Sequence, residues 1–207
     1  MGGKGMIKII GLTGPSGAGK SCCSLLFAEL NFPVIDADRV YHSLIDSYSP
    51  CVQELVDAFG DGILDGNKAI DRKALGKLVF SDESRAAARR LNLITHKFVK
   101  GETLRLLDEY RGKSYRAVVI DAPLLFEADF DDFCDFCISV LAPVSVRLER
   151  IVKRDAITKE QAEARIAAQQ PDEYYSSRAS YTVINDTSVE DMTARIREIL
   201  EKEGLLA

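Results

Sequence analysis

The sequence predicts an α/β fold in which a doubly wound parallel sheet of five strands is covered by helices. Three observations predict it. Short, almost continuous apolar runs recur along the chain, amphipathic helical segments separate them, and a glycine-rich turn follows the first run. The length of 207 residues suits one domain, or one domain that carries an insertion.

The expected strands are apolar throughout rather than alternating, which is typical of strands buried on both faces. They are residues 8–12, 32–35, 117–121, 136–141 and 182–185. Helices are expected between them, at residues 21–30, 39–45, 144–154, 157–170 and 189–203. Thr158, with Gln161 three residues later, and Ser188, with two acidic residues after it, predict the N-terminal caps of the last two helices.

The middle of the chain has a different pattern. It contains the helical segments VQELVDAF and RKALGKLVF and a long helix predicted over about 82–110, but no run that resembles a buried strand. We therefore expect a core made of residues 1–46 and 113–207, interrupted by a helical insertion at 47–112.

Composition limits the classes of function. The net charge of −5 argues against nucleic acid or an anionic membrane as the main partner, and no apolar run reaches the length of a membrane span. The opening residues lack the features of a signal peptide, and the odd number of cysteines suits a reducing compartment, so we expect a cytoplasmic protein. Cys134 and Cys137 could form a redox pair or half of a zinc site, but a structural role is favoured because nothing completes such a site.

The glycine-rich turn fits the phosphate-loop pattern G-x-x-x-x-G-K-[ST] at every fixed position, follows a strand and opens a helix. Its residues are Gly14, Pro15, Ser16, Gly17, Ala18, Gly19, Lys20 and Ser21. Backbone amides of such a loop bind phosphate, the lysine reaches the β- and γ-phosphates, and the serine hydroxyl can bind Mg²⁺. Asn67-Lys68 lacks the aspartate that a GTPase needs two residues further on. A chain this short, with a helical insertion after the second strand, favours a small-molecule kinase of the P-loop NTPase type.

Three carboxylates follow expected strands, at the edge where ligands bind in such sheets: Asp36, Asp38 and Asp121. One could orient an acceptor hydroxyl and take its proton, and another could serve Mg²⁺. Asp36 and Asp38 would point the same way if the backbone stays extended, and Asp121 ends its strand as a Walker-B acid does. The alternative is that one of them only caps a helix, as Asp38 could do for the helix at 39–45.

Basic side chains gather after the fourth expected strand, namely Arg147, Arg150, Lys153, Arg154 and Arg165. Three of the arginines recur at a spacing that places them on roughly one helix face. They could neutralise the transferred phosphoryl group from a lid at about 147–172, or they could form a solvated face that pairs with Glu149 and Glu163. The spacing leaves both possibilities open.

Together, these motifs resemble the dephospho-CoA kinase family over most of the chain. The matching segments are IIGLTGPSGAGKS, VIDADRVYHSL, IDRKALGKLVF, VVIDAPLLFEA, RLERIVKRD, ITKEQAEARIAAQ and TVIND. The sequence departs from the family pattern at Cys22, at Lys97 after His96, at Ser180 and at Asn185-Asp186.

The resemblance implies a P-loop nucleotide-binding core, a helical insertion that binds the acceptor, and transfer of phosphate from ATP to the ribose 3′-hydroxyl of dephospho-CoA. It implies Asp38 as the base, with Lys20, Arg150 and Arg154 as the other catalytic residues. Acceptor contacts are expected from Asp36, Asp38, Arg72, His96, Leu124 and Glu127. Nucleotide contacts are expected from the phosphate loop with Cys22 and Asn185, and Mg²⁺ contacts from Ser21 and Asp121. We expect a monomer or weak oligomer. The alternative functions are those of another P-loop nucleoside, nucleotide or small-metabolite kinase, or of a non-catalytic ATP-binding regulator.

Overall fold

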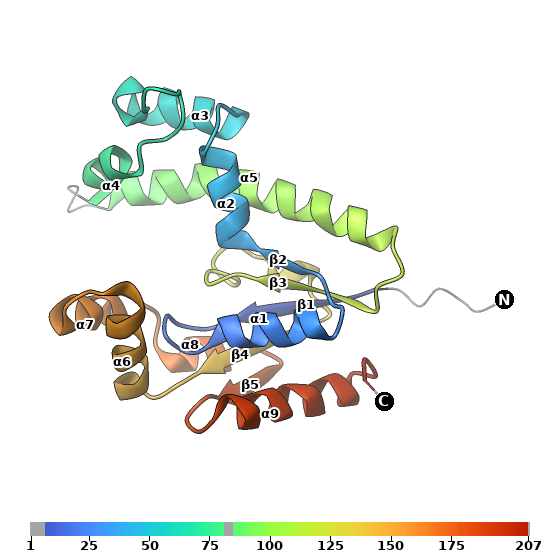
Figure 1. Cartoon of the computed structure of the whole chain (residues 1–207). Coiled ribbons are helices and arrows are strands. Elements are labelled where there is room, and N and C mark those ends of the chain that lie inside the picture. Colours follow the sequence, from blue (N-terminus) through green and yellow to red (C-terminus); the bar gives the residue numbers. More distant parts are fainter. Residues whose placement is uncertain (1–6, 81–84, 207) are drawn as a thin grey trace. The chain divides into compact units, whose positions relative to one another are not determined.

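The computed structural model describes residues 7–80 and 85–206 and divides into two compact units (Figure 1). The core unit comprises the chain up to Ile35 and from Glu109 onward, and the helical unit comprises Asp36–Asp108. The borders predicted from the sequence were 47 and 112. The first border differs because Ile45, at the end of α2 (Ala37–Ile45), is fully buried in the hydrophobic cluster of the helical unit.

Five strands form the sheet of the core unit, in the order β2-β3-β1-β4-β5. Their bounds are β1 Lys8–Thr13, β2 Val34–Asp36, β3 Ala117–Asp121, β4 Phe136–Leu141 and β5 Tyr181–Ile184. β1 pairs in parallel with β3 and β4, and β4 pairs in parallel with β5. The predicted parallel five-stranded fold is confirmed.

The central strands are apolar on both faces because both faces are covered. Every residue of β4 is buried, and so is every residue of β1 after Lys8. Leu26 and Phe27 of α1 (Lys20–Glu29) pack with Met192 and Ile196 of α9 (Val189–Lys202) in one cluster with strand residues such as Ile10. This cluster anchors the helix that carries the phosphate loop at its start.

The remaining helices of the core unit follow β3 and β4. They are η2 Asp131–Phe133, α6 Val144–Asp155, α7 Lys159–Ala167 and α8 Asp172–Ser176. The capping box predicted for α7 at Thr158 and the cap predicted for α9 at Ser188 are both present, and Ser188 also forms a capping box with Asp191. α8 was not predicted from the sequence, because a helix of five residues is too short to show a hydrophobic period.

The helical unit contains no named strand among its described residues, apart from the terminal residue of β2. Its elements are α2, α3 Pro50–Phe59, η1 Asp61–Ile63, α4 Arg72–Phe80 and α5 Ala86–Arg111, of which the last ends within the core unit. Ser49 caps α3, and buried side chains such as Leu55 and Ile63 form the core of the unit. The predicted long helix is confirmed from Ala86 onward, and its expected start at 82–84 lies outside the described residues.

All five cysteines are free thiols. A Cβ atom added at Gly11 of β1 would lie 2.8 Å from the sulfur of Cys137 and 3.0 Å from that of Cys134, so both thiols pack against this strand. Within the described ranges, we find no group of three histidine, cysteine, aspartate or glutamate side chains that could hold a metal ion. The packing favours the structural role. None of the helices in residues 7–80 and 85–206 is both long and apolar enough to cross a membrane.

Candidate active site

The phosphate loop connects β1 to α1 and depends on glycine backbone conformations. Gly14, Gly17 and Gly19 have φ values of 139°, 80° and 110°. Gly19 also caps α1, and a Cβ atom there would lie 2.2 Å from Nδ2 of Asn185. Another residue would be strained at this position and would collide with the amide. The loop therefore ends directly at the helix start, and the N-terminal end of a helix favours an anion.

Lys20 extends back along the loop. Its ammonium nitrogen donates a hydrogen bond of 2.8 Å to the carbonyl oxygen of Gly14, the first residue of the loop. The side chain thus spans the loop from its last turn to its beginning. This position places a positive charge beside the backbone that is expected to hold phosphate.

Asn185 follows β5 and is almost completely buried. Its Nδ2 donates a 2.7 Å hydrogen bond to the carbonyl oxygen of Ala18, and its Oδ1 accepts one of 3.4 Å from Arg150. The asparagine expected on the nucleotide side therefore holds the backbone of the phosphate loop. Its contact with a nucleotide stays a prediction.

The three arginines at the predicted spacing on α6 all contact the phosphate loop. Arg147 Nε donates to the carbonyl oxygen of Ser16 at 3.0 Å, and Arg154 Nη2 lies 3.3 Å from the Ser16 hydroxyl oxygen. Arg150 Nη1 donates to the carbonyl oxygen of Gly17 at 3.2 Å. Of the two possibilities that the spacing left open, these contacts favour a helix face directed at the loop over a solvated face.

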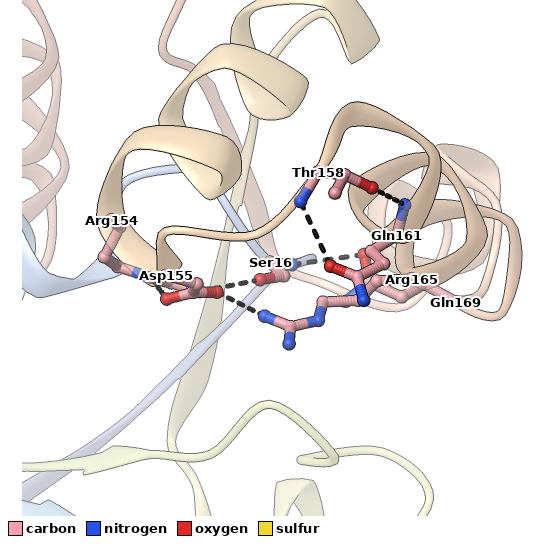
Figure 2. Close-up of polar contacts among 7 residues, drawn as sticks. All are labelled: Ser16, Arg154, Asp155, Thr158, Gln161, Arg165 and Gln169. Carbon is pink, nitrogen blue, oxygen red and sulfur yellow. Dashed lines mark hydrogen bonds and ion pairs between the residues drawn. The ribbon is translucent and has the colours of Figure 1, made fainter.

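A group of charged side chains surrounds Asp155, where α6 ends (Figure 2). Arg154 donates to both carboxylate oxygens of Asp155, at 2.7 and 2.9 Å, and Arg165 of α7 forms an ion pair with the same carboxylate. These hydrogen bonds, first that from Arg154, lower the pKa of Asp155 to about 2. Asp155 therefore stays ionised at neutral pH and orients two arginines near the loop.

Asp121 lies at the end of β3, opposite Leu12 of β1 in the parallel register. Ser24, one turn into α1, donates a 2.7 Å hydrogen bond from its hydroxyl group to Oδ2 of Asp121. Ser21 lies in the first turn of the same helix and is exposed. One hydroxyl and one carboxylate beside a phosphate loop are oxygen ligands of the kind that Mg²⁺ takes together with phosphates and water, so these residues fit the ion.

Asp36 and Asp38 belong to the helical unit and differ in role. The carboxylate of Asp36 accepts a 3.0 Å hydrogen bond from the backbone amide of Arg39 and caps α2. Asp38 is exposed in the first turn of that helix. The expectation that Asp38 could be the cap was wrong, and so was the premise of an extended backbone through both residues, because α2 already begins at Ala37.

The other predicted acceptor residues lie in both units. Arg72 begins α4 and forms an ion pair with Asp46, and His96 lies in α5. In the core unit, Leu124 and Glu127 follow β3; Leu124 is exposed, and burial raises the pKa of Glu127. The acceptor roles of these residues stay predictions.

Sequence reasoning missed several residues that contact the loop or its neighbours. Arg147 was predicted only as one of the basic side chains that could neutralise the phosphoryl group, and Ser24, Asp155 and Gln169 received no role. Asp155 and Gln169 lie within the two segments after β4 that resemble the kinase family, and this was the available signal. The side-chain oxygen of Gln169 accepts from the backbone amide of Ser16 at 3.3 Å.

A phosphate loop at the carboxyl edge of a parallel sheet, contacted by arginines of the helix that follows β4, defines the class of P-loop phosphotransferases. The model of the dephospho-CoA kinase family matches residues 8–191. The chain belongs to the dephospho-CoA kinase family, as the resemblance predicted.

Curated dephospho-CoA kinases are similar to this chain over nearly its full length. A dephospho-CoA kinase of Lactobacillus johnsonii is 34% identical over 96% of this chain and 100% of its own. One of Carboxydothermus hydrogenoformans is 36% identical over 95% of both chains.

Solved structures also match this chain over nearly its full length. A crystal structure of a Thermus thermophilus protein has a TM-score of 0.78 at 30% identity and covers 96% of this chain and 98% of that one. Dephospho-CoA kinase from Campylobacter jejuni has a TM-score of 0.62 at 25% identity, with the same coverage. A shikimate kinase of Bacteroides thetaiotaomicron, with a TM-score of 0.56 at 17% identity over 95% of this chain and 99% of that one, shows the fold alone.

Proposed function

We propose that the protein transfers the γ-phosphoryl group of ATP to the ribose 3′-hydroxyl of dephospho-CoA, which yields coenzyme A and ADP. Family membership over residues 8–191 supports the reaction. The observation that carries it is the phosphate loop, which Lys20 spans and three arginines of α6 contact. Phosphoryl transfer needs little covalent chemistry from the protein, and such positioned charge is its main requirement.

On the donor side, the loop amides at the start of α1 bind the phosphates of ATP, and Lys20 neutralises the β- and γ-phosphates. Arg150 and Arg154 stabilise the charge that spreads over the transferred group. Cys22 and Asn185 complete the nucleotide site; the hydrogen bonds of Asn185 to the loop support its part in it.

Ser21 and Asp121 would hold Mg²⁺. The ion supplies neutralisation of phosphate charge when it is bound. The hydrogen bond from Ser24 to Asp121 supports this assignment, because it fixes the carboxylate beside the helix that carries Ser21.

On the acceptor side, Asp38 takes the proton of the 3′-hydroxyl group as it attacks, and its exposed position in α2 leaves the carboxylate accessible. Dephospho-CoA is bound by Asp36, Arg72, His96, Leu124 and Glu127, by resemblance to the family. We further propose a cytoplasmic monomer or weak oligomer; the free thiols support a reducing compartment.

An assay of ADP release tests the function. The purified protein receives ATP, Mg²⁺ and, in separate reactions, dephospho-CoA, AMP, UMP or adenosine. We expect turnover with dephospho-CoA, and the product should carry phosphate at the 3′ position. Turnover with another acceptor alone would identify a different small-molecule kinase. If no acceptor is used although ADP binds, the chain is a nucleotide-binding regulator.

A further inference from the structure

Ser16 of the phosphate loop is held at all three of its polar groups by side chains of α6 and of the segment between α7 and α8. Its amide donates to Oε1 of Gln169 at 3.3 Å, and its carbonyl oxygen accepts from Nε of Arg147 at 3.0 Å. Its hydroxyl oxygen lies 3.3 Å from Nη2 of Arg154. Figure 2 shows Ser16 between Arg154 and Gln169. The backbone amide and carbonyl groups of this residue are therefore both fixed by side chains from distant parts of the chain.

Arg147 is the most deeply buried member of this group, with 2% of its surface exposed. Its Nη2 donates a 2.6 Å hydrogen bond to the same oxygen of Gln169 that binds the Ser16 amide. Its Nη1 lies 3.4 Å from Asp172, whose side chain is 44% exposed. Burial lowers the pKa of Arg147, and Asp172 opposes this. A guanidinium group costs free energy when it is buried, unless its donors find such well-placed partners.

Gly17, the next loop residue, packs closely against the backbone of α6. A Cβ atom added at Gly17, where φ is 80°, would lie 2.8 Å from the backbone carbonyl oxygen of Arg147. The first turn of α6 therefore lies against the loop through its backbone as well as through the Arg147 side chain. Contacts from α6 and from Gln169 therefore fix the loop conformation at Ser16 and Gly17. Gln169 lies between α7 and α8.

We propose that Arg147 and Gln169 are positioning residues that hold the Ser16 peptide and thereby orient the loop amides that bind nucleotide phosphate. We name this pair the loop brace. The proposal rests on the proposed function only in that the loop binds the phosphates of ATP or ADP. The fork of the arginine is essential to it, because Nε and Nη2 reach Ser16 and Gln169 together and a lysine has a single nitrogen.

Calorimetric titration with ADP tests the brace in Arg147→Lys and in Gln169→Met. Lysine keeps the charge, and methionine keeps most of the length of glutamine without its hydrogen bonds. We expect each variant to bind ADP about tenfold to a hundredfold more weakly, as expected for loss of hydrogen bonds to a charged group. KM for ATP should rise more than kcat falls. Because the two residues act as a unit, the double variant should be at most about twofold weaker than the weaker single variant.

Ile151→Val is the matched control for a general loss of stability. Ile151 is fully buried on the same helix, and loss of one methylene group lowers stability without a change in hydrogen bonding. The control should lower the unfolding temperature and leave the affinity for ADP unchanged. Should Ile151→Val weaken ADP binding as much as the brace variants do, the effect is general loosening and the brace is refuted.

Three further outcomes separate the hypotheses. If Arg147→Lys binds ADP within about twofold of the unchanged protein, only the charge matters and the brace is refuted. If Arg147→Lys does not fold, Gln169→Met decides, since Gln169 is only partly buried. A chain that shows the expected loss of ADP binding in the variants but never phosphorylates dephospho-CoA would retain the brace and lose the proposed function.

Discussion

Among single residues, Lys20 has the most direct part in the proposed reaction. Its ammonium group already lies at the loop, 2.8 Å from the carbonyl oxygen of Gly14. We expect Lys20→Ala to lower kcat by more than about 10²-fold, the usual cost of losing one preorganised charge or donor at a developing negative charge. ADP release with dephospho-CoA measures this. Lys153→Ala is the control, since Lys153 is exposed on α6; a similarly mild effect in both variants would mean that the loop is not the phosphate site.

Asp38 allows a test of acid–base chemistry that leaves its helix intact. Because the carboxylate that caps α2 belongs to Asp36, Asp38→Asn exchanges a carboxylate for an amide of the same shape and leaves the cap in place. We expect kcat to fall by about 10²–10⁴-fold while ADP affinity stays as it is. Turnover by Asp38→Asn close to that of the unchanged protein would move the role of the base to Asp36 or Asp121.

At the level of elements, the connection between α6 and α7 depends on an ionised carboxylate. The pKa of Asp155 lies at about 2 in the folded protein, below the ordinary aspartate value of 3.8, first because Arg154 hydrogen-bonds to it. A lowered folded-state pKa means that the stabilisation is complete at neutral pH and is lost as the pH falls from about 4 to about 2.

We therefore expect Asp155→Asn to be less stable than the unchanged protein near pH 7, and the difference in urea midpoint to shrink as the pH falls through this window. Urea unfolding at a series of pH values between 7 and 2 measures it. A difference in midpoint that stays constant with pH would show that the ion pairs with Arg154 and Arg165 do not stabilise the fold.

The start of α7 provides a second test at this scale. Thr158 accepts a hydrogen bond from the backbone amide of Gln161, and the Gln161 side chain accepts one from the amide of Thr158. Thr158→Ala should cost about 0.5–2 kcal/mol of unfolding free energy, whereas Thr158→Ser keeps the oxygen and should cost less. Urea unfolding measures both variants; equal losses would mean that the methyl group rather than the cap stabilises the helix.

The fold was largely predictable because its elements carry local signals. The strands 117–121 and 136–141 were predicted with the bounds they have, since strands buried on both faces are apolar throughout. The phosphate loop was predictable because its conformation requires a fixed glycine pattern. The border of the helical unit was not, because whether α2 belongs to it is decided by the burial of Ile45 in tertiary packing.

The contacts within the candidate site also depend on tertiary packing and could not be predicted from the sequence. The spacing of the arginines on α6 placed them on one face, but could not tell which surface that face contacts. The burial of Arg147 and its shared partner Gln169 depend on how α6, α7 and the residues before α8 fold back onto the loop. Such contacts join residues more than twenty positions apart and leave no local pattern in the sequence.

At the level of the whole molecule, net charge and local charge differ. The chain carries −5, yet Lys20, Arg147, Arg150 and Arg154 all contact the phosphate loop. An acidic protein can therefore present a basic site to two polyanionic substrates, which the sum of charges does not reveal.

The two units also have hydrophobic clusters of their own. This suggests a test of the prediction that the core unit binds the nucleotide and the helical unit binds the acceptor. Leu55 of α3 is fully buried, and all members of its cluster come from the helical unit. Leu55→Ala should remove about 2–5 kcal/mol from the stability of that unit. Backbone amides of residues 36–108 should then exchange hydrogen faster, KM for dephospho-CoA should rise, and ADP affinity should stay unchanged.

Hydrogen exchange followed by mass spectrometry, together with ADP titration, measures these effects. Leu26→Ala in α1 is the matched control, because Leu26 belongs to the cluster of the core unit that anchors the phosphate loop. This variant should weaken ADP binding and speed exchange in the strands and helices of the core unit. If Leu55→Ala weakens ADP binding as much as Leu26→Ala does, the chain behaves as one cooperative domain. The assignment of nucleotide and acceptor binding to separate units would then be wrong.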